Sequence, residues 1–303
     1  MIQLEHLTKR FGAKTAVDDV SITVHAGKVT GFLGPNGAGK TTTMRMIMGF
    51  DRPTEGSATI NGKRYGQLAS PLNEVGALLD AKAVHTGRSA YNHLLAMAAT
   101  HGLPKKRVSE VIALTGLESV AKKRVGGFSL GMGQRLGIAS ALLGDPETLI
   151  LDEPINGLDP EGVLWVRQLV RYLAGEGRTV FLSSHLMSEM AQTADHIVVL
   201  GRGRVLADAP VEQILAGATK KSVRVRTPQL ERLISALTGP EVSITNREAG
   251  VVDVFGLDAA HIGDLAAQQS IPLHELTPLT ASLEEAYLEL TDSSVEYRSE
   301  TQA

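Results

Sequence analysis

The chain has 303 residues, 43% of them hydrophobic, which is enough for one large domain and a smaller second one. The absence of cysteine excludes disulfides, thiolate catalysis and cysteine metal sites, and a formal net charge of −3 gives no overall attraction to nucleic acid, so no nucleic-acid partner is expected. No apolar run reaches the roughly 18 residues of a membrane span, and the first residues lack a secretory signal, so we expect an intracellular protein.

The first predicted elements are short strands. Residues 2–7 and 20–24 alternate apolar and polar side chains, which predicts half-exposed antiparallel strands. The apolar run 28–33 predicts a buried strand, and a helix is expected over 43–48. A further strand at 58–60 runs into Asn-Gly, which is a strong hairpin signal.

A glycine-rich segment joins the buried strand to the helix and fits the pattern G-x-x-x-x-G-K-[ST]. Glycines let backbone N–H groups approach phosphate oxygens, and the helix dipole points at the nucleotide. Lys40 would reach the β- and γ-phosphates, and Thr41 would ligate Mg²⁺. The spacing and the flanking elements disfavour a turn without a ligand, so we predict a nucleoside triphosphate site. Its residues are Gly34, Pro35, Asn36, Gly37, Ala38, Gly39, Lys40, Thr41 and Thr42.

Residues from about 89 to 143 predict a helical subdomain, with helices over 91–101 and 104–115. Two apolar strands at 148–151 and 179–182 follow, of the kind found in parallel sheets covered on both faces. Trp165 lies on the helix between these strands, where core packing explains it better than ligand stacking. A hairpin over 197–206 completes the pattern.

The strand at 148–151 leads into two carboxylates, Asp152 and Glu153. An acid at such a strand end can hold Mg²⁺ beside Thr41, and we assign this role to Asp152. Glu153 would orient and deprotonate the attacking water near the γ-phosphate. Alone, such a pair often caps a helix or pairs with a base. Together with the phosphate loop, it indicates catalysis.

Three further polar residues also have structural explanations. Ser129 and Asp159 each precede a predicted helix and can cap it. His185 follows the strand at 179–182, and a lone histidine there is more often structural than catalytic. None of the three indicates a function by itself.

The predicted elements divide the chain into two domains. Residues 1–217 alternate short strands with helices, as an α/β domain does. Residues 218–291 predict a small α+β accessory domain, with strands at 222–226 and 251–255, helices at 229–237 and 259–268, and a closing helix at 282–290. Residues 292–303 are polar and predict a frayed tail.

In this order and spacing, the motifs of residues 1–215 resemble the ATP-binding subunits of ABC transporters. The resemblance covers the phosphate loop, a signature segment at 128–134, the strand at 149–153, a D-loop at 156–159 and the switch histidine, His185. Phe11 falls where the family stacks an aromatic ring on adenine, although an aromatic residue on a strand edge also has a structural explanation.

This resemblance implies a fold, ligands and a subgroup. It implies an α/β P-loop NTPase, in which a mixed sheet has antiparallel edge strands and a helical subdomain. It also implies ATP and Mg²⁺ as ligands. The single ATP-binding domain, the signature and the C-terminal extension look most like ABC-2 type exporters of drugs, peptides or polysaccharides.

The resemblance also implies partners. In the family, two subunits, identical or homologous, associate head to tail around two ATP molecules. Ser129 and Gly131 would then bond the γ-phosphate held by the other subunit, and His185 would bond the one in its own. Asp159 would communicate across the interface. An integral membrane permease would dock on the segment after Asp80, with this chain peripheral on the cytoplasmic face of the membrane.

Two segments depart from the family pattern. The signature, usually L-S-G-G-Q, reads F-S-L-G-M over 128–132, a variation common in this subgroup. The Q-loop glutamine, which touches Mg²⁺ in the family, aligns with Asp80, and exporters of lantibiotics or bacitracin-like peptides resemble the chain in this acid. We expect Asp80 to be the Q-loop residue and a Mg²⁺ ligand. A surface turn acid is the alternative.

We therefore predict an ATPase subunit that drives export through a separate membrane protein. A relative acting on ribosomes or DNA would carry two nucleotide domains or a long coiled coil, and this sequence has one phosphate loop and no sustained heptads. A nucleotide-binding regulator without turnover would not need intact Lys40, Asp152, Glu153 and His185.

Overall fold

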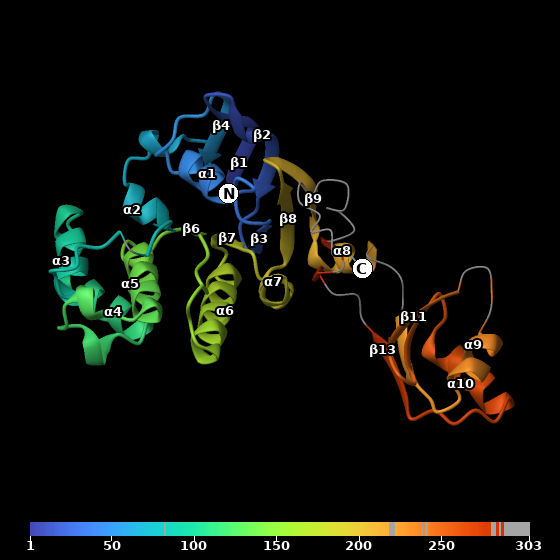
Figure 1. Ribbon diagram of the computed structural model, residues 1–303. Helices are drawn as coiled ribbons and strands as arrows, with labels where there is room; N and C mark the ends of the chain where they lie inside the picture. Colours follow the sequence, from blue (N-terminus) through green and yellow to red (C-terminus); the bar gives the residue numbers. More distant parts are fainter. Residues whose placement is uncertain are drawn as a thin grey trace. The chain divides into compact units, whose positions relative to one another are not determined.

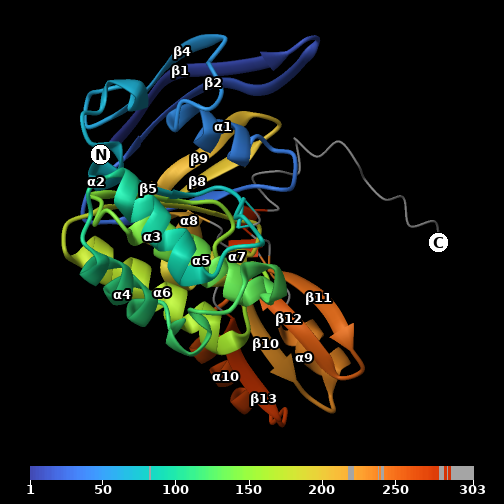
Figure 2. The same ribbon diagram turned by 90° about the vertical axis from the view of Figure 1, so that its left-hand side faces the viewer.

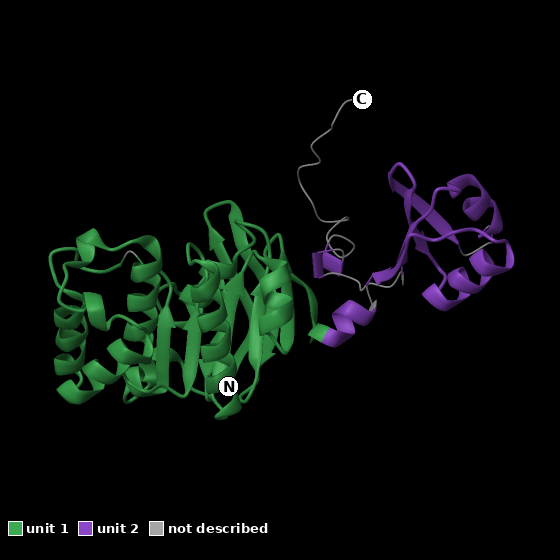
Figure 3. Cartoon of the chain, turned by 90° about the horizontal axis from the view of Figure 1, so that it is seen from below, with its two compact units in different colours: residues 1–211, 290–303 green, residues 212–289 purple. Residues whose placement is uncertain are grey.

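The computed structural model describes residues 1–81, 83–217, 222–237, 239, 242–279, 283–284 and 286–287. The chain divides into two compact units, Met1–Val211 and Glu212–Glu289 (Figure 3). The predicted tail at 292–303 lies outside the described residues, as do residues 282, 285 and 288–290 of the predicted closing helix.

A six-stranded sheet forms the centre of the first unit (Figure 1). Its strands are parallel except the last, which returns as an antiparallel hairpin partner of its neighbour. In sheet order they are β5 (Val75–Leu78), β6 (Thr148–Leu151), β7 (Thr179–Ser184), β3 (Val29–Leu33), β8 (His196–Gly201) and β9 (Arg204–Pro210). Every residue of β3, β6 and β7 is buried, which explains the apolar runs within them.

A second, antiparallel sheet contains β2 (Lys14–Val24), β1 (Ile2–Phe11) and β4 (Glu55–Ile60), in that order. The predicted antiparallel strands are confirmed, and β1 and β2 are longer than their alternating cores. Helix α1 (Lys40–Ile47) packs in the core that joins both sheets. That core is mostly aliphatic, with one aromatic contact between Phe32 and Phe181, whose ring centroids lie 5.1 Å apart.

A group of three helices forms the predicted helical subdomain. Figures 1 and 2 both place α3 (Ala90–Thr100), α4 (Lys105–Leu114) and α5 (Leu130–Leu142) side by side. The other helices of this unit are α2 (Pro71–Glu74), α6 (Pro160–Gly175) and α7 (Met187–Thr193). Trp165 on α6 is half-buried, and the Arg135 guanidinium covers its ring at 4.5 Å.

The second unit is a small α+β fold. After α8 (Val211–Gly217), its antiparallel sheet has the order β11 (Ser243–Glu248), β12 (Val251–Phe255), β10 (Ser222–Arg226) and β13 (Glu275–Leu279). Helices α9 (Leu230–Ala236) and α10 (Ala259–Gln268) bury the valines of β10 and β12 on one face. On the strands' other side, the side chain of Asp253 is fully buried between Arg224 at 2.9 Å and Arg247 at 2.6 Å. These arginines hold the pKa of Asp253 below its usual range.

Candidate functional site

The site is built on three neighbouring strands. In the sheet, β7 lies between β6 and β3, and all three are parallel. Their carboxyl ends therefore meet at one edge, where ligands bind in open α/β sheets. Register pairs Leu33 with Ser184 and Leu151 with Leu182. The phosphate loop, Asp152 as the predicted Mg²⁺ ligand and the switch histidine, His185, are thus brought together.

The phosphate loop turns directly into α1. Gly39 has φ of 107°, and a Cβ there would lie 2.5 Å from the carbonyl oxygen of Ala16, so only glycine fits. No side chain caps the helix at this residue. The first N–H groups of α1 have no partner within the helix, and the helix dipole makes this end suitable for an anion.

Lys40 lies buried inside the loop. Its Nζ donates to the carbonyl oxygen of Gly34 at 2.7 Å and lies 3.5 Å from Oε1 of Glu153. The side chain is 6% exposed. The ammonium group is therefore held against the loop by a backbone acceptor, at the position from which it can contact a phosphate.

A hydroxyl and a carboxylate from different elements meet beside the loop. Thr41 Oγ1 donates to Oδ2 of Asp152 at 2.5 Å. The other carboxylate oxygen of Asp152 accepts from Ser183 Oγ, also at 2.5 Å. Thr41 and Asp152 supply oxygen atoms, which are the ligands that Mg²⁺ prefers.

Glu153 has an unusual backbone conformation. Its φ is 50°, in the left-handed region that non-glycine residues avoid. Its N–H donates to Ser183 Oγ at 2.9 Å, so the same serine contacts both acids. Its carboxylate lies 2.8 Å from Nδ1 of His185, which is 39% exposed at the site edge. The predicted base therefore lies between the loop lysine and the switch histidine.

A cavity of about 350 Å³ opens over the loop. Glu153 forms part of its wall, and Phe11 lies at its rim with 52% of its surface exposed. Lys9 lies 4.9 Å from the Phe11 ring centroid. An exposed aromatic ring beside a phosphate loop is available for stacking on a base, as predicted for adenine.

Ser129 and Asp159 both cap helices, as their structural explanations predicted. Ser129 Oγ accepts from the N–H of Met132 at 3.2 Å, and Asp159 Oδ1 accepts from that of Gly162 at 2.9 Å. The leucine that replaces the first signature glycine, Leu130, packs on the D-loop, where a Cβ on Gly157 would collide with it.

Asp80 lies just beyond β5, next to β6, the strand that leads into Asp152. The backbone N–H of Asp152 donates to the carbonyl oxygen of Leu78 at 2.7 Å, so the two strand ends are neighbours. Asp80 is exposed and does not line the cavity over the loop. Its predicted Mg²⁺ contact stays a prediction.

Two residues that contact the acids were not assigned roles from the sequence. Ser183 bridges Asp152 and Glu153, and Gln134 on α5 donates from Nε2 to the carbonyl oxygens of Glu153 at 3.1 Å and Asn156 at 3.3 Å. A signal for Ser183 existed, because a hydroxyl interrupts the apolar run of β7 just before the switch histidine. Gln134 gave no signal beyond its place at the end of the signature.

The motifs and this geometry agree with the comparisons. A family model described as ABC transporter matches residues 17–156, and a model for a domain of unknown function matches 221–284. The bacitracin transport ATP-binding protein BcrA of Bacillus licheniformis is 43% identical over 217 residues, which are 71% of each chain. The chain belongs to the ABC transporter ATP-binding family. It is an ATPase subunit of a transporter, and the resemblance drawn from its motifs is confirmed.

Other relatives align with both units of this chain. The uncharacterized ABC transporter ATP-binding protein YhcH of Bacillus subtilis (strain 168) is 35% identical over an alignment of 307 residues, covering 98% of this chain and 97% of its own. The solved structure of an ATP-binding subunit of an ABC transporter matches with a TM-score of 0.65 at 26% identity, over 72% of this chain and 92% of that one.

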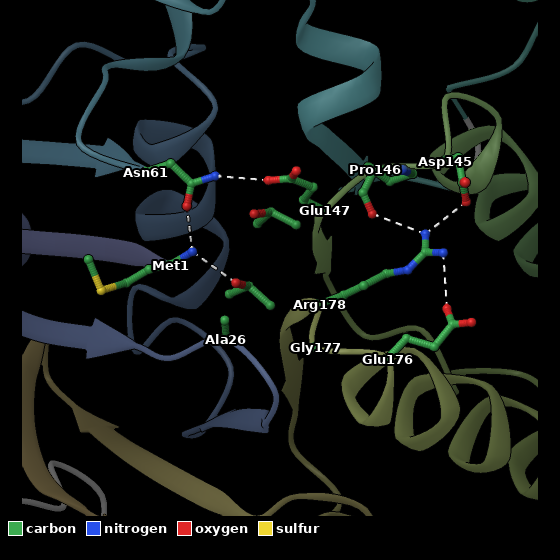
Figure 4. A pocket seen from close by; sticks show the side chains of 11 residues that line it. Met1, Ala26, Asn61, Asp145, Pro146, Glu147, Glu176, Gly177 and Arg178 are labelled. Atoms are coloured by element: carbon green, nitrogen blue, oxygen red, sulfur yellow. Dashed lines mark hydrogen bonds and ion pairs between the residues drawn. The ribbon is translucent and has the colours of Figure 1, made fainter.

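A second cavity of the ABC ATPase, about 390 Å³, lies at the opposite ends of β6 and β7 (Figure 4). Its arginine, Arg178, contacts Asp145 at 2.9 Å and Glu176 at 3.0 Å. The wall also includes Glu147. Because acids surround this guanidinium, the cavity is a poor place for a phosphate, and the cavity over the loop remains the candidate nucleotide site.

Within the described part of the ABC ATPase, every helix is too short or too polar to cross a bilayer.

Proposed function

We propose that this ATPase cleaves the γ-phosphate of ATP with Glu153 as the general base. The observation that carries the proposal is that four side chains meet at one edge of the sheet: Lys40, Asp152, Glu153 and His185. The Glu153 carboxylate lies 3.5 Å from Nζ of Lys40 and 2.8 Å from Nδ1 of His185. Lys40 would bond the transferred phosphate. Glu153 would orient and deprotonate the attacking water, and His185 would bond the γ-phosphate.

Magnesium is the metal that these residues fit. Thr41 and Asp152 already bring two oxygen atoms within 2.5 Å of each other, and oxygen atoms are the ligands that Mg²⁺ prefers. We infer that both would hold Mg²⁺, with Asp80 as a further oxygen ligand from the neighbouring strand end. When bound, the ion would offset the charge that develops on the phosphate oxygens.

We further propose that two copies, or this chain and a homologous subunit, associate head to tail around two ATP molecules. Ser129 and Gly131 would then bond the γ-phosphate held by the partner subunit, and Asp159 would lie at the interface. Gly131 supports this, because its own chain leaves room for a Cβ, 3.4 Å from the nearest atoms. The packing of the protomer does not require glycine there. Close approach by a partner would.

We infer that ATP hydrolysis by this subunit drives the export of a peptide-like substrate. BcrA, which shares 43% of its aligned residues with this chain, is a bacitracin transport protein. The substrate would pass through a separate integral membrane permease, with the ATPase on the cytoplasmic face. The permease would dock on the segment that follows Asp80. We also propose residues 1–217 as the ATP-binding domain and 218–291 as an accessory domain.

Glu153→Gln tests both the base and the dimer. The amide cannot accept the proton, so we expect turnover to fall by roughly 10²- to 10⁴-fold. ATP should then trap a dimer, visible by size-exclusion chromatography with light scattering. Wild-type turnover in Glu153→Gln would contradict the base assignment, and a monomer with ATP bound would contradict the dimer. Membrane co-purification of the tagged wild-type chain with an integral membrane protein tests the transport role.

A further inference from the structure

Gln134 links the signature helix to the catalytic strand end. It lies on α5, the helix that Ser129 caps. Its Nε2 donates to the carbonyl oxygen of Glu153 at 3.1 Å and to that of Asn156, in the D-loop, at 3.3 Å. The residue is 6% exposed. One buried side chain of α5 therefore contacts the backbone of the proposed base and the D-loop together.

The orientation of this amide follows from its neighbours. Two carbonyl oxygens within hydrogen-bond distance can accept only from an NH₂ group, so the nitrogen must face Glu153 and Asn156. The oxygen atom Oε1 of Gln134 then lies buried, with no hydrogen-bond partner among the described residues. A buried acceptor without a donor is unfavourable, and an apolar side chain of the same shape would avoid that penalty but would take the donor away from two carbonyl oxygens. The effects of this glutamine on stability therefore oppose each other.

The carbonyl group that Gln134 holds belongs to a strained residue. Glu153 has φ of 50°, and such a conformation persists only where neighbours hold it. Its N–H donates to Ser183 Oγ at 2.9 Å, and its carbonyl oxygen also accepts from the N–H of Asn156 at 3.1 Å. Side chains from β7 and α5 thus hold the two peptide units on either side of the Glu153 Cα. The carboxylate of Glu153 is aimed from that backbone.

We propose that Gln134 is a positioning residue for ATP hydrolysis, which holds Glu153 in its left-handed conformation and couples it to the signature segment. This rests on the proposed roles of Glu153 and of the head-to-tail dimer. When the signature segment closes on the γ-phosphate bound by the partner subunit, any shift of α5 moves Gln134, and through it the backbone of Glu153. Nucleotide at one site of the dimer thereby alters the position of the base at the other.

The test is Gln134→Met, which removes the donor and the unpaired acceptor at nearly constant shape. Steady-state ATP turnover would be measured with thermal unfolding of the same protein. We expect kcat to fall on the order of 10- to 100-fold, with the KM for ATP unchanged. The unfolding midpoint should change little, because the lost hydrogen bonds and the removed unpaired acceptor oppose each other. Gln168→Met makes the same change on an exposed position of α6 and should leave kcat at the wild-type value.

Two more measurements distinguish positioning from a structural role. In the Glu153→Gln background, adding Gln134→Met should cause no further loss, because Gln134 acts through Glu153. The dependence of rate on ATP concentration should also lose cooperativity in Gln134→Met. Additive losses in the double variant would overturn the proposal, and so would a lower unfolding midpoint that accounts for the lost activity.

The remaining outcomes separate this inference from the proposed function. Wild-type kcat in Gln134→Met refutes the positioning role, while Glu153→Gln still reports on the base. Normal turnover in Glu153→Gln removes the proposed function itself. If Gln134→Met fails to fold, Gln134→Asn decides, because its amide is one methylene too short to reach both carbonyls. That variant should show the same selective loss of kcat, and wild-type kcat would refute the role.

Discussion

Replacing Ser183 with alanine removes the hydroxyl that joins the two acids of the site. Ser183 is fully buried on β7, the strand between the phosphate-loop strand and the Asp152 strand. It donates to Asp152 Oδ1 at 2.5 Å and accepts from the N–H of Glu153 at 2.9 Å. Ser183→Ala therefore leaves the Asp152 carboxylate with one fewer donor and the Glu153 N–H without its acceptor.

The size of the effect follows from the charge on Asp152. A hydrogen bond to a charged group contributes about 1.5–3 kcal/mol, and about 1.4 kcal/mol corresponds to tenfold in an equilibrium constant. Residues that orient a metal ligand typically change metal affinity by about 10- to 100-fold when replaced. The two estimates agree, so we expect Ser183→Ala to raise the free Mg²⁺ concentration at half-maximal ATPase rate by about 10- to 100-fold.

The assay is ATPase rate against free Mg²⁺ at saturating ATP. Ser184→Ala is the matched control, because Ser184 is the next residue on β7 and is also fully buried. In the part of the chain that the structure describes, its hydroxyl accepts only a backbone N–H, that of Leu186, at 2.9 Å. That control should keep the wild-type Mg²⁺ dependence. An unchanged Mg²⁺ dependence in Ser183→Ala would show that this serine does not orient Asp152, the proposed Mg²⁺ ligand.

Three further predictions concern the rim of the site, the Q-loop and the second unit. Phe11→Ala should weaken ATP binding about tenfold through lost stacking, whereas Phe50→Ala, at an exposed phenylalanine outside the cavity, should leave the dissociation constant unchanged. Asp80→Asn should shift the Mg²⁺ dependence of turnover, and an identical profile would identify a surface acid. Asp253→Asn should lower the free energy of unfolding of the second unit by about 1–3 kcal/mol at neutral pH, read from hydrogen exchange in β10 and β12. Because Arg224 lowers the pKa of Asp253, the stability difference between wild type and Asp253→Asn is fully present above the pKa of the unfolded state, about 4. It should shrink as the pH falls through the lower pKa of the folded state. A stability difference that stayed constant down to about pH 2 would count against the ion pairs.

Local patterns were sufficient for the elements that carry the site. The phosphate loop, Asp152 and Glu153 adjoin strand ends in the sequence, so their position at the sheet edge followed from the strands themselves. Strand β11 was not predicted, because it contains only one apolar residue, Ile244, and most of its side chains are exposed. Strand β13 was also missed, since Pro278 interrupts its short apolar pattern. The segment of β5 was interpreted only as the Q-loop.

The contacts that support the acids could not be predicted in this way. Ser183 meets Asp152 only because β7 lies between β3 and β6, and strand order depends on how crossovers pack, not on local periodicity. Gln134 reaches Glu153 only after α5 has packed beside β5 and β6. Both depend on tertiary neighbours far apart in the chain.

The order β6-β7-β3 means that main-chain hydrogen bonds, rather than loops, set the spacing of the hydrolytic groups. Adjacent strands lie about 4.8 Å apart whatever side chains they carry. Substitutions elsewhere, such as leucine and methionine within the signature, leave that interval unaltered. Changes on the outer surfaces can therefore accumulate while the backbone keeps the distance between the phosphate loop and the two acids.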